Sequence, residues 1–203
     1  MIYLNGHALC AIDVETTGLV AGYHEITQVC FLPLDATLEV RQDIIPFDLL
    51  LHIEHEDRID PDAMKLTRTK FYEHQQKAID KYQAADLLVE WVERFNLPFR
   101  KRIMPLAHNW KFDAAFILEW LGPTSFEQFI DGRSRDTMCC ALYANDIAAM
   151  RHEQVPFPKV NLPYVASQLK IPHDRAHEAL ADCVTTVEVY KKMMNHRMLQ
   201  GLS

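Results

Sequence analysis

The feature that most constrains the fold is an apolar run near the start of the chain, residues 8–14, which has acidic residues at its end. The run stops at the turn signal Thr16-Thr17-Gly18 and therefore predicts a buried strand. Asp13 and Glu15 are two residues apart, so on a strand both carboxylates face the same side, about 6–7 Å apart along the chain. Like charges held this close repel each other unless a cation lies between them. The alternative is a pair of solvated acids on an exposed edge strand.

The order of the predicted elements indicates an α/β domain. Strands are expected over residues 8–14 and 25–34, and a third strand, broken near Pro46, is expected within residues 38–53. Asp60 and Pro61 open a short helix as its N-cap and first residue. The remaining elements are a helix over residues 76–95, a strand over 103–107, a helix over 110–121 that stops at Gly122-Pro123, and helices over 136–150, 162–169 and 178–199. This order predicts an antiparallel hairpin on a parallel core.

The size of the chain fits one domain. Its 203 residues, 49% of them hydrophobic, suffice to bury one core, so a single domain is expected over residues 1–203. No apolar run is long enough to cross a bilayer, and the first residues lack the basic and apolar segments of a signal peptide. The five cysteines form no Cys-x-x-Cys pair, which predicts buried free thiols and a cytoplasmic location.

The net charge restricts the kind of nucleic-acid contact that the chain could make. At −7, with a pI near 5.8, the chain lacks the charge for a broad basic face that grips long duplexes. The charge does not exclude an enzyme that takes only the last few nucleotides of a strand. There, divalent ions would supply the local positive charge, and part of the acidic count would be their ligands.

Two further patches carry candidate residues. Asp113 lies just inside a predicted helix start, where Asn109 could act as the cap; alternatively, Asp113 only complements the positive helix N-terminus. His177 and Asp182 are five residues apart and would diverge by about 140° within one helix. We therefore expect His177 on the preceding loop or first turn, with Asp182 one turn into the helix. The alternative for His177 is an ordinary surface or core histidine.

The donor types in these patches favour one class of metal. Four carboxylates without partner cysteines suit Mg²⁺ or Mn²⁺ far better than zinc. The histidine beside them suggests a proton acceptor.

Three motifs, in this order, resemble the exonuclease motifs of the DEDD superfamily of 3′–5′ exonucleases. They are Asp-Val-Glu-Thr-Thr-Gly from Asp13, His-Asn-x-x-Phe-Asp ending at Asp113, and His-x-x-x-x-Asp from His177 to Asp182. The third motif has the form of the DEDDh branch, which includes proofreading subunits, RNase T and oligoribonuclease. The resemblance implies an RNase H-like mixed sheet flanked by helices.

The resemblance also implies an activity and its residues. Two Mg²⁺ (or Mn²⁺) ions would be held by Asp13, Glu15, Asp113 and Asp182, with His177 as general base. Terminal phosphodiester bonds of DNA or RNA would be hydrolysed from a 3′ end, releasing nucleoside 5′-monophosphates. The implied substrate contacts are Thr16, Thr17, Gly18, Met64, Thr67 and Asn109; for Met64, ordinary helix packing is the favoured alternative. The chain departs from the family at Gln28, where glutamate is frequent, and in Leu66-Thr67-Arg68, which lacks a glycine.

Several partners and roles remain open from the sequence. We expect a single-stranded 3′ end as the substrate and no membrane partner. A homodimer is an alternative, because some relatives dimerise to complete a substrate groove. A proofreading subunit docked on a polymerase is less favoured, because little chain follows Asp182 for a docking domain. A non-catalytic binding module of the same fold and an endonuclease are the other readings.

Overall fold

The computed structural model describes residues 6–61, 68–173 and 178–195. Its centre is a five-stranded sheet in the order β3-β2-β1-β4-β5. The strands are β1 (Ala8–Thr16), β2 (Ile26–Leu34), β3 (Phe47–Leu50), β4 (Ile103–Ala107) and β5 (Arg135–Asp136). β2 is antiparallel to β1 and to β3, whereas β4 is parallel to β1 and to β5. The predicted mixed sheet, an antiparallel hairpin beside parallel strands, is confirmed.

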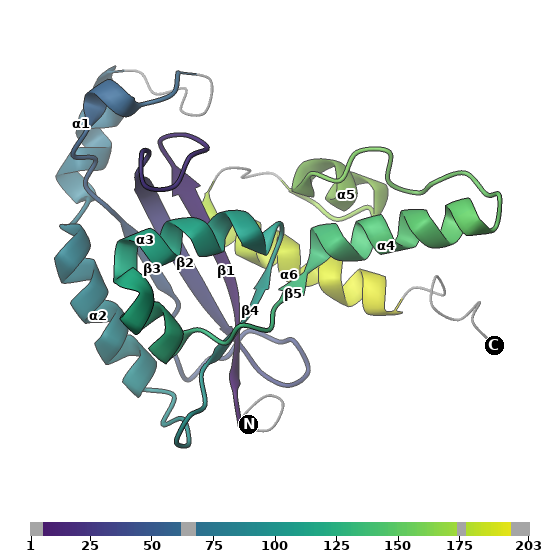
Figure 1. Ribbon diagram of the computed structural model, residues 1–203, viewed down its shortest axis with the longest axis horizontal. Coiled ribbons are helices and arrows are strands. Elements are labelled where there is room, and N and C mark those ends of the chain that lie inside the picture. Colours follow the sequence, from purple (N-terminus) through teal and green to yellow (C-terminus); the bar gives the residue numbers. More distant parts are fainter. Residues whose placement is uncertain (1–5, 62–67, 174–177, 196–203) are drawn as a thin grey trace.

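Helices cover both faces of this sheet (Figure 1). They are the 3₁₀ helix η1 (Glu56–Arg58), α1 (Arg68–Lys77), α2 (Lys81–Glu93), α3 (Trp110–Phe129), α4 (Thr137–Met150), α5 (Leu162–Gln168) and α6 (Ala179–Asn195). α2 and α3 pack on one face and α6 on the other. α4 and α5 extend beyond the β5 edge, where α5 packs against α6.

The side-chain alternation along β1 decides where its carboxylates lie. Ile12 and Val14 belong to the core beneath α2 and α3, whereas Leu9 and Ala11 pack with α6. Successive side chains of a strand point to opposite faces, so Asp13 continues the row of Leu9 and Ala11. The two acidic residues of β1 therefore face the α6 side of the sheet.

The helix predicted over residues 76–95 is wrong as one element, because α1 ends at Lys77 and α2 begins at Lys81. Between them, the Ile79 amide donates to the Leu50 carbonyl (2.9 Å), and Ile79 in turn accepts from the His52 amide (3.0 Å). The backbone of Ile79 thus pairs with the chain at the end of β3. Helical periodicity cannot reveal this non-local pairing.

Two further elements follow the prediction. The third strand, expected within residues 38–53, is β3. The helix expected over residues 110–121 does end at Gly122, whose backbone angles are not helical (φ 72°, ψ 161°), and a second helical segment of α3 then runs to Phe129. The two-residue strand β5 was not anticipated, and the helix expected from Asp60 and Pro61 runs into residues outside the described ranges.

The cysteines only partly follow the prediction. All five are free, and Cys10, Cys30 and Cys183 are buried. Cys139, in the first turn of α4, is exposed. No helix within the described ranges has both the length and the apolar character needed to cross a membrane.

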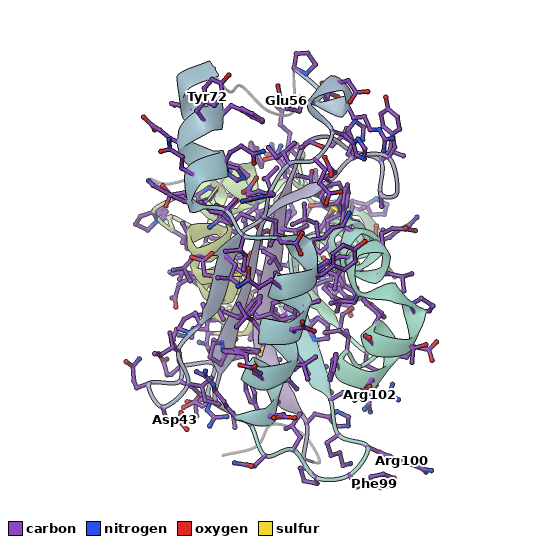
Figure 2. All side chains as sticks on the ribbon, turned by 90° about the vertical axis from the view of Figure 1, so that its left-hand side faces the viewer. Asp43, Glu56, Tyr72, Phe99, Arg100 and Arg102 are labelled. Carbon is purple, nitrogen blue, oxygen red and sulfur yellow. The ribbon has the colours of Figure 1, made fainter. Side chains whose placement is uncertain are left out.

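The two ends of the sheet differ in character. β1 and β4 both start near the loop that joins α2 to β4, since Ala8 pairs with Ile103. Figure 2 shows Phe99, Arg100 and Arg102 of this loop at the end of the molecule opposite Glu56 and Tyr72. The basic residues therefore lie at the starts of these strands, and the acidic residues of β1 lie toward its end.

Candidate metal centre

Carboxylates from two distant segments meet above the end of β1. One oxygen each of Asp13, Glu15 and Asp182 lies within 4.8 Å of the others. Asp182 is in the first turn of α6, as the sequence predicts, and α6 packs directly on β1 through Ala179 and Cys183. The fold thus joins the first and third predicted patches.

Asp113 joins this group from the other side of β1. It lies in the first turn of α3 and is only 3% exposed. β4 pairs with β1 only as far as Leu106, opposite Ala11, so the rest of β1 has no strand on that edge. The Val14 amide there donates to Asp113 Oδ1 (3.1 Å). The Asp113 carboxylate accepts the hydrogen bond that a neighbouring strand would otherwise accept from Val14. This contact fixes Asp113 beside the acids of β1.

Burial and mutual repulsion make the ionised forms of these carboxylates unfavourable. Burial, followed by the charges of Asp113, Glu15 and Asp182, raises the pKa of Asp13 well above its usual value. Burial also raises the pKa of Asp113, although the Val14 amide opposes the shift. Four hard oxygen donors whose ionised forms repel one another fit Mg²⁺ or Mn²⁺, because a divalent cation cancels the repulsion. Asp13, Glu15, Asp113 and Asp182 are therefore the residues that could hold such ions.

Asp136 fixes the helix that carries Asp113. Its carboxylate accepts hydrogen bonds from the amides of Asn109 (3.1 Å) and Trp110 (2.8 Å) at the start of α3. It also accepts from the Met138 and Cys139 amides and so caps α4. One side chain therefore accepts hydrogen bonds from the backbone amides at the starts of two helices.

The prediction that Asn109 caps α3 with its side chain is wrong. Asn109 occupies the cap position, but it has left-handed backbone angles (φ 71°, ψ 51°), and its side chain forms no capping hydrogen bond. Asparagine tolerates this conformation better than most residues. The capping carboxylate comes from Asp136, which lies 27 residues away along the chain.

His108, the first residue of the second motif, has a hydrogen-bond partner at each ring nitrogen. Its Nε2 lies 2.8 Å from the Val160 carbonyl and its Nδ1 lies 2.8 Å from Thr137 Oγ1. Burial lowers the pKa of His108, so its neutral form is favoured. The ring thereby links the start of α4 to the segment that precedes α5.

The turn after β1 holds three predicted substrate contacts. Thr17 is fully buried; its hydroxyl accepts from the Glu25 amide (2.9 Å), and its carbonyl accepts from the Asp60 amide (2.8 Å). Thr16 Oγ1 donates to the Gly18 carbonyl (2.6 Å). A Cβ at Gly18 would overlap the His24 imidazole, so this close approach requires glycine.

Three predicted residues, His177, Met64 and Thr67, lie outside the described ranges. A different histidine reaches the site: His173 Nε2 lies 2.6 Å from Asp182 Oδ1. Sequence reasoning missed this contact. The available signal was a second histidine four residues before His177, on the same loop.

Gln28 lies beside the carboxylates. It pairs with Glu15 across β1 and β2. Its Nε2 donates to Asp48 Oδ1 (2.8 Å), and its Oε1 accepts from the Ala179 amide at the start of α6 (3.4 Å). This neutral residue connects β3 to α6 without adding a further negative charge to the site.

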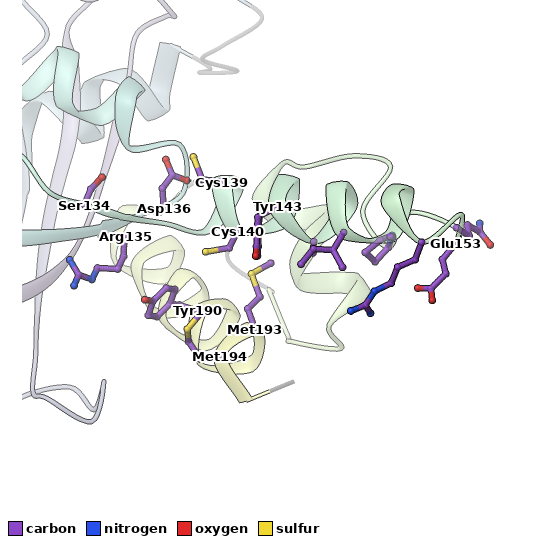
Figure 3. Close-up of a pocket in the computed structure, with 16 residues that line it drawn as sticks. Ser134, Arg135, Asp136, Cys139, Cys140, Tyr143, Glu153, Tyr190, Met193 and Met194 are labelled. Carbon is purple, nitrogen blue, oxygen red and sulfur yellow. Dashed lines mark hydrogen bonds between the residues drawn. The ribbon is translucent and has the colours of Figure 1, made fainter. Parts of the chain in front are cut away.

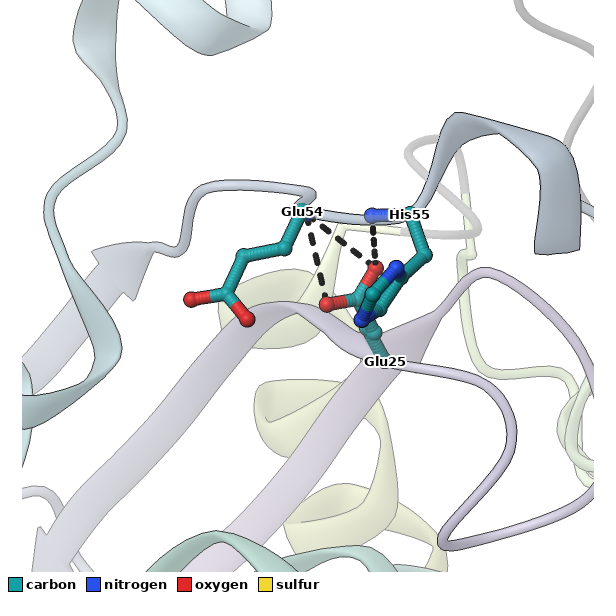
Figure 4. A group of neighbouring side chains, drawn as sticks. All are labelled: Glu25, Glu54 and His55. Carbon is teal, nitrogen blue, oxygen red and sulfur yellow. Dashed lines mark hydrogen bonds between the residues drawn. The ribbon is translucent and has the colours of Figure 1, made fainter.

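A second acidic cluster, formed by Glu25, Glu54 and His55, has a structural explanation (Figure 4). The Glu25 carboxylate accepts from the backbone amides of Glu54 (3.1 Å) and His55 (2.8 Å). The Glu54 carboxylate instead forms an ion pair with Lys81 (2.7 Å). These bonds hold the loop after β3 against the start of β2.

A groove of about 680 Å³ lies between α4 and α6, and none of the four carboxylates lines it. Figure 3 shows Cys140 and Tyr143 of α4 facing Tyr190, Met193 and Met194 of α6. Its lining is mainly apolar, whereas the candidate metal centre is an acidic surface at the end of the sheet. The groove is therefore separate from the candidate metal centre.

Solved structures with a similar fold are nucleases. Exonuclease I of E. coli, solved with single-stranded DNA and zinc, is 18% identical with a TM-score of 0.69, over 98% of this chain and 43% of that chain. Exonuclease I of Methylocaldum szegediense is 20% identical with a TM-score of 0.68, over 97% of this chain and 41% of that one. Cell-death related nuclease 4 is 14% identical with a TM-score of 0.64, over 93% of this chain and 64% of that one.

The chain spans less than half the length of these exonuclease I proteins, and the low identities establish similarity of fold alone. No curated protein sequence matches the chain. The sequence profile of the RNase T-type exonuclease family, however, matches residues 10–190, a range that contains all four carboxylates. The protein therefore belongs to the exonuclease family within the DEDD superfamily.

Proposed function

We propose that this protein is a metal-dependent 3′–5′ exonuclease of the DEDDh branch. It hydrolyses terminal phosphodiester bonds of DNA or RNA and releases nucleoside 5′-monophosphates. The observation that carries the proposal is the convergence of Asp13, Glu15, Asp113 and Asp182 from three separate segments. The family match supports nucleic-acid hydrolysis as the chemistry of such a site.

The chain's own residues divide into ligands and a proton acceptor. When bound, two divalent ions supply positive charge for the phosphate and for the oxygens that attack and leave. The four carboxylates would hold these ions, from a strand and from the first turns of two helices. His177 would accept the proton of the attacking water.

We propose a single-stranded 3′ end as the substrate. The net charge of −7 disfavours a long duplex footprint, since duplex binding depends on neutralising many phosphates. Similarity to an exonuclease I solved with single-stranded DNA supports the same choice. We propose that the Thr16–Gly18 turn, which directly follows Glu15 in the chain, contacts the terminal nucleotide, with Met64, Thr67 and Asn109 as further contacts.

The location and self-association of the protein are also proposals. Free cysteines at buried and exposed positions suit a reducing compartment, and we propose the cytoplasm. Size-exclusion chromatography with light scattering tests for a homodimer. Co-purification with a polymerase would indicate a proofreading role.

A digestion panel tests the proposed function. We expect 5′-labelled DNA or RNA oligonucleotides with free 3′ ends to give a ladder of shortened products in Mg²⁺ or Mn²⁺ and none in EDTA. Oligonucleotides with blocked 3′ ends should remain intact. Retention without a ladder would identify a binding module, and cleavage of circular single strands would identify an endonuclease.

A further inference from the structure

We propose that His173 is a positioning residue, which holds the Asp182 carboxylate in the orientation that a divalent ion requires. His173 Nε2 lies 2.6 Å from Asp182 Oδ1, a short distance for a nitrogen–oxygen hydrogen bond. The side chain of His173 is 8% exposed and that of Asp182 is 14% exposed. The pair therefore forms in a partly dehydrated environment, where a hydrogen bond restricts side-chain motion strongly. This inference rests on the proposed metal-dependent function.

The segment that carries His173 is well anchored. Lys170, two residues beyond the end of α5, has the left-handed conformation (φ 58°). The Lys170 amide donates to the Ser167 carbonyl (3.0 Å), and the Ile171 amide donates to the Ala166 carbonyl (2.9 Å). This pair of bonds is a Schellman motif, which fixes the direction of the chain as it leaves a helix. His173 follows two residues later.

α5, which precedes the segment that carries His173, packs against α6, the helix that carries Asp182. Val165 and Ala166 of α5 are fully buried against Val189 and Met193 of α6, and Ile171 packs against the same cluster. The His173–Asp182 hydrogen bond thus closes the α5–α6 layer at the end nearest to β1. An aspartate in the first turn of a helix can rotate about its side-chain bonds, and this contact selects one orientation.

The hydrogen bond leaves the carboxylate able to bind a cation. A carboxylate has about four acceptor positions, and the Nε2–H group of His173 occupies only one of them. A donor from a neighbouring side chain is the usual partner of a metal-ligating group, and its loss typically lowers metal affinity 10–100-fold. Because Nε2 is directed at Asp182, His173 supports a ligand, and the role of proton acceptor is left to His177.

Metal binding distinguishes this role from general structural support. We will compare His173→Phe, which keeps a ring but has no donor, with His173→Gln, which retains a side-chain N–H. The matched control is His52→Phe, because His52 forms a comparable hydrogen bond (2.7 Å) with a backbone carbonyl, Ala78 O, and not with one of the four carboxylates. Mn²⁺ titration followed by electron paramagnetic resonance measures affinity without substrate.

We expect His173→Phe to weaken Mn²⁺ binding about 10–100-fold, His173→Gln to restore most of it, and His52→Phe to leave it unchanged. Saturating Mn²⁺ should return the kcat of His173→Phe to near the wild-type value. Wild-type Mn²⁺ affinity in His173→Phe, a kcat loss that no Mn²⁺ concentration restores, or equal losses in His173→Gln or His52→Phe would overturn the proposal while leaving the metal centre intact. Absence of Mn²⁺ binding by the wild-type protein would instead overturn the proposed function itself.

Discussion

Asp13 is a proposed ligand whose ionised form is unfavourable in the folded protein. Burial, and then the charges of Asp113, Glu15 and Asp182, oppose its ionisation. At neutral pH the ion-free protein must either keep a proton on this group of carboxylates or bear their repulsion. A residue that disfavours folding but lies among potential ligands is the expected signature of a functional site.

The first prediction concerns Asp13→Ala. The variant should lose detectable cleavage, because a proposed metal ligand is missing, yet unfold at a higher temperature than the wild type in EDTA. The stability gain should be roughly 1–2 kcal/mol, since removal of one carboxylate relieves the repulsion among the others. Differential scanning calorimetry measures the gain, and Asp146→Ala, at an exposed position on α4, is the control. Near wild-type turnover in Mg²⁺ would refute the assignment of Asp13.

The second prediction concerns His177→Ala. Loss of the proposed proton acceptor should lower kcat about 10²–10⁴-fold. The defect should shrink as pH rises, because hydroxide then replaces the deprotonation step. A pH–rate profile of the variant measures this effect. A loss that stays constant across the pH range would argue against a role in proton transfer.

At the scale of the elements, α3 and α4 are coupled through one side chain. The Asp136 carboxylate binds two amides at the start of α3 and two at the start of α4. Asp113 lies in the first turn of α3, so the position of a proposed ligand depends on a residue from β5. The metal centre is therefore sensitive to the junction of β5 and α4.

The third prediction follows from this coupling. Asp136→Ala should destabilise the protein by about 1–2 kcal/mol, a typical cost for a lost helix cap, and should also weaken Mn²⁺ binding. Asp80→Ala is the matched control, because Asp80 caps α2 alone through the Tyr82 and Gln83 amides. Asp80→Ala should cost a similar amount of stability with unchanged Mn²⁺ affinity. Equal effects of both variants on Mn²⁺ binding would mean that the coupling is only global.

The elements also show what the sequence could and could not predict. The apolar run with Asp13 and Glu15, the strand before Asp113 and the helix start at Asp182 are local patterns, and the structure contains all three elements. The break at Ile79 and the cap by Asp136 were missed, because each depends on a hydrogen bond between distant segments. The His173–Asp182 contact was missed because its geometry depends on the exit from α5, which periodicity does not describe.

At the scale of the whole molecule, the two ends of the sheet differ. One end carries the four carboxylates, and the opposite end carries a cluster of charged side chains around Asp131. At the latter, Asp131 accepts from Arg133 Nε (2.8 Å) and lies 3.5 Å from His7 Nδ1. The Arg133 hydrogen bonds lower the pKa of Asp131 to about 2. The Asp131 amide also donates to the Ile103 carbonyl (2.7 Å), which ties this cluster to the start of β4.

The fourth prediction concerns the acid stability of this end. A carboxyl whose pKa is lower in the folded protein stabilises the fold above its ordinary pKa of 3.8, and this contribution disappears as pH falls through about 2. Asp131→Asn should therefore lower the free energy of unfolding by roughly 1–2 kcal/mol at pH 7, with a smaller difference near pH 2. Urea titrations at several pH values measure both. A difference that is independent of pH would contradict the ion-pair explanation.

Manganese-soaked crystals test the central claim most directly, because anomalous diffraction locates the metal without reference to activity. Folding brings together oxygens from β1, α3 and α6, and we predict anomalous peaks within coordination distance of Asp13, Glu15, Asp113 and Asp182. These peaks should be absent from crystals of Asp13→Ala. Manganese-soaked wild-type crystals without a peak among these four side chains would contradict the account.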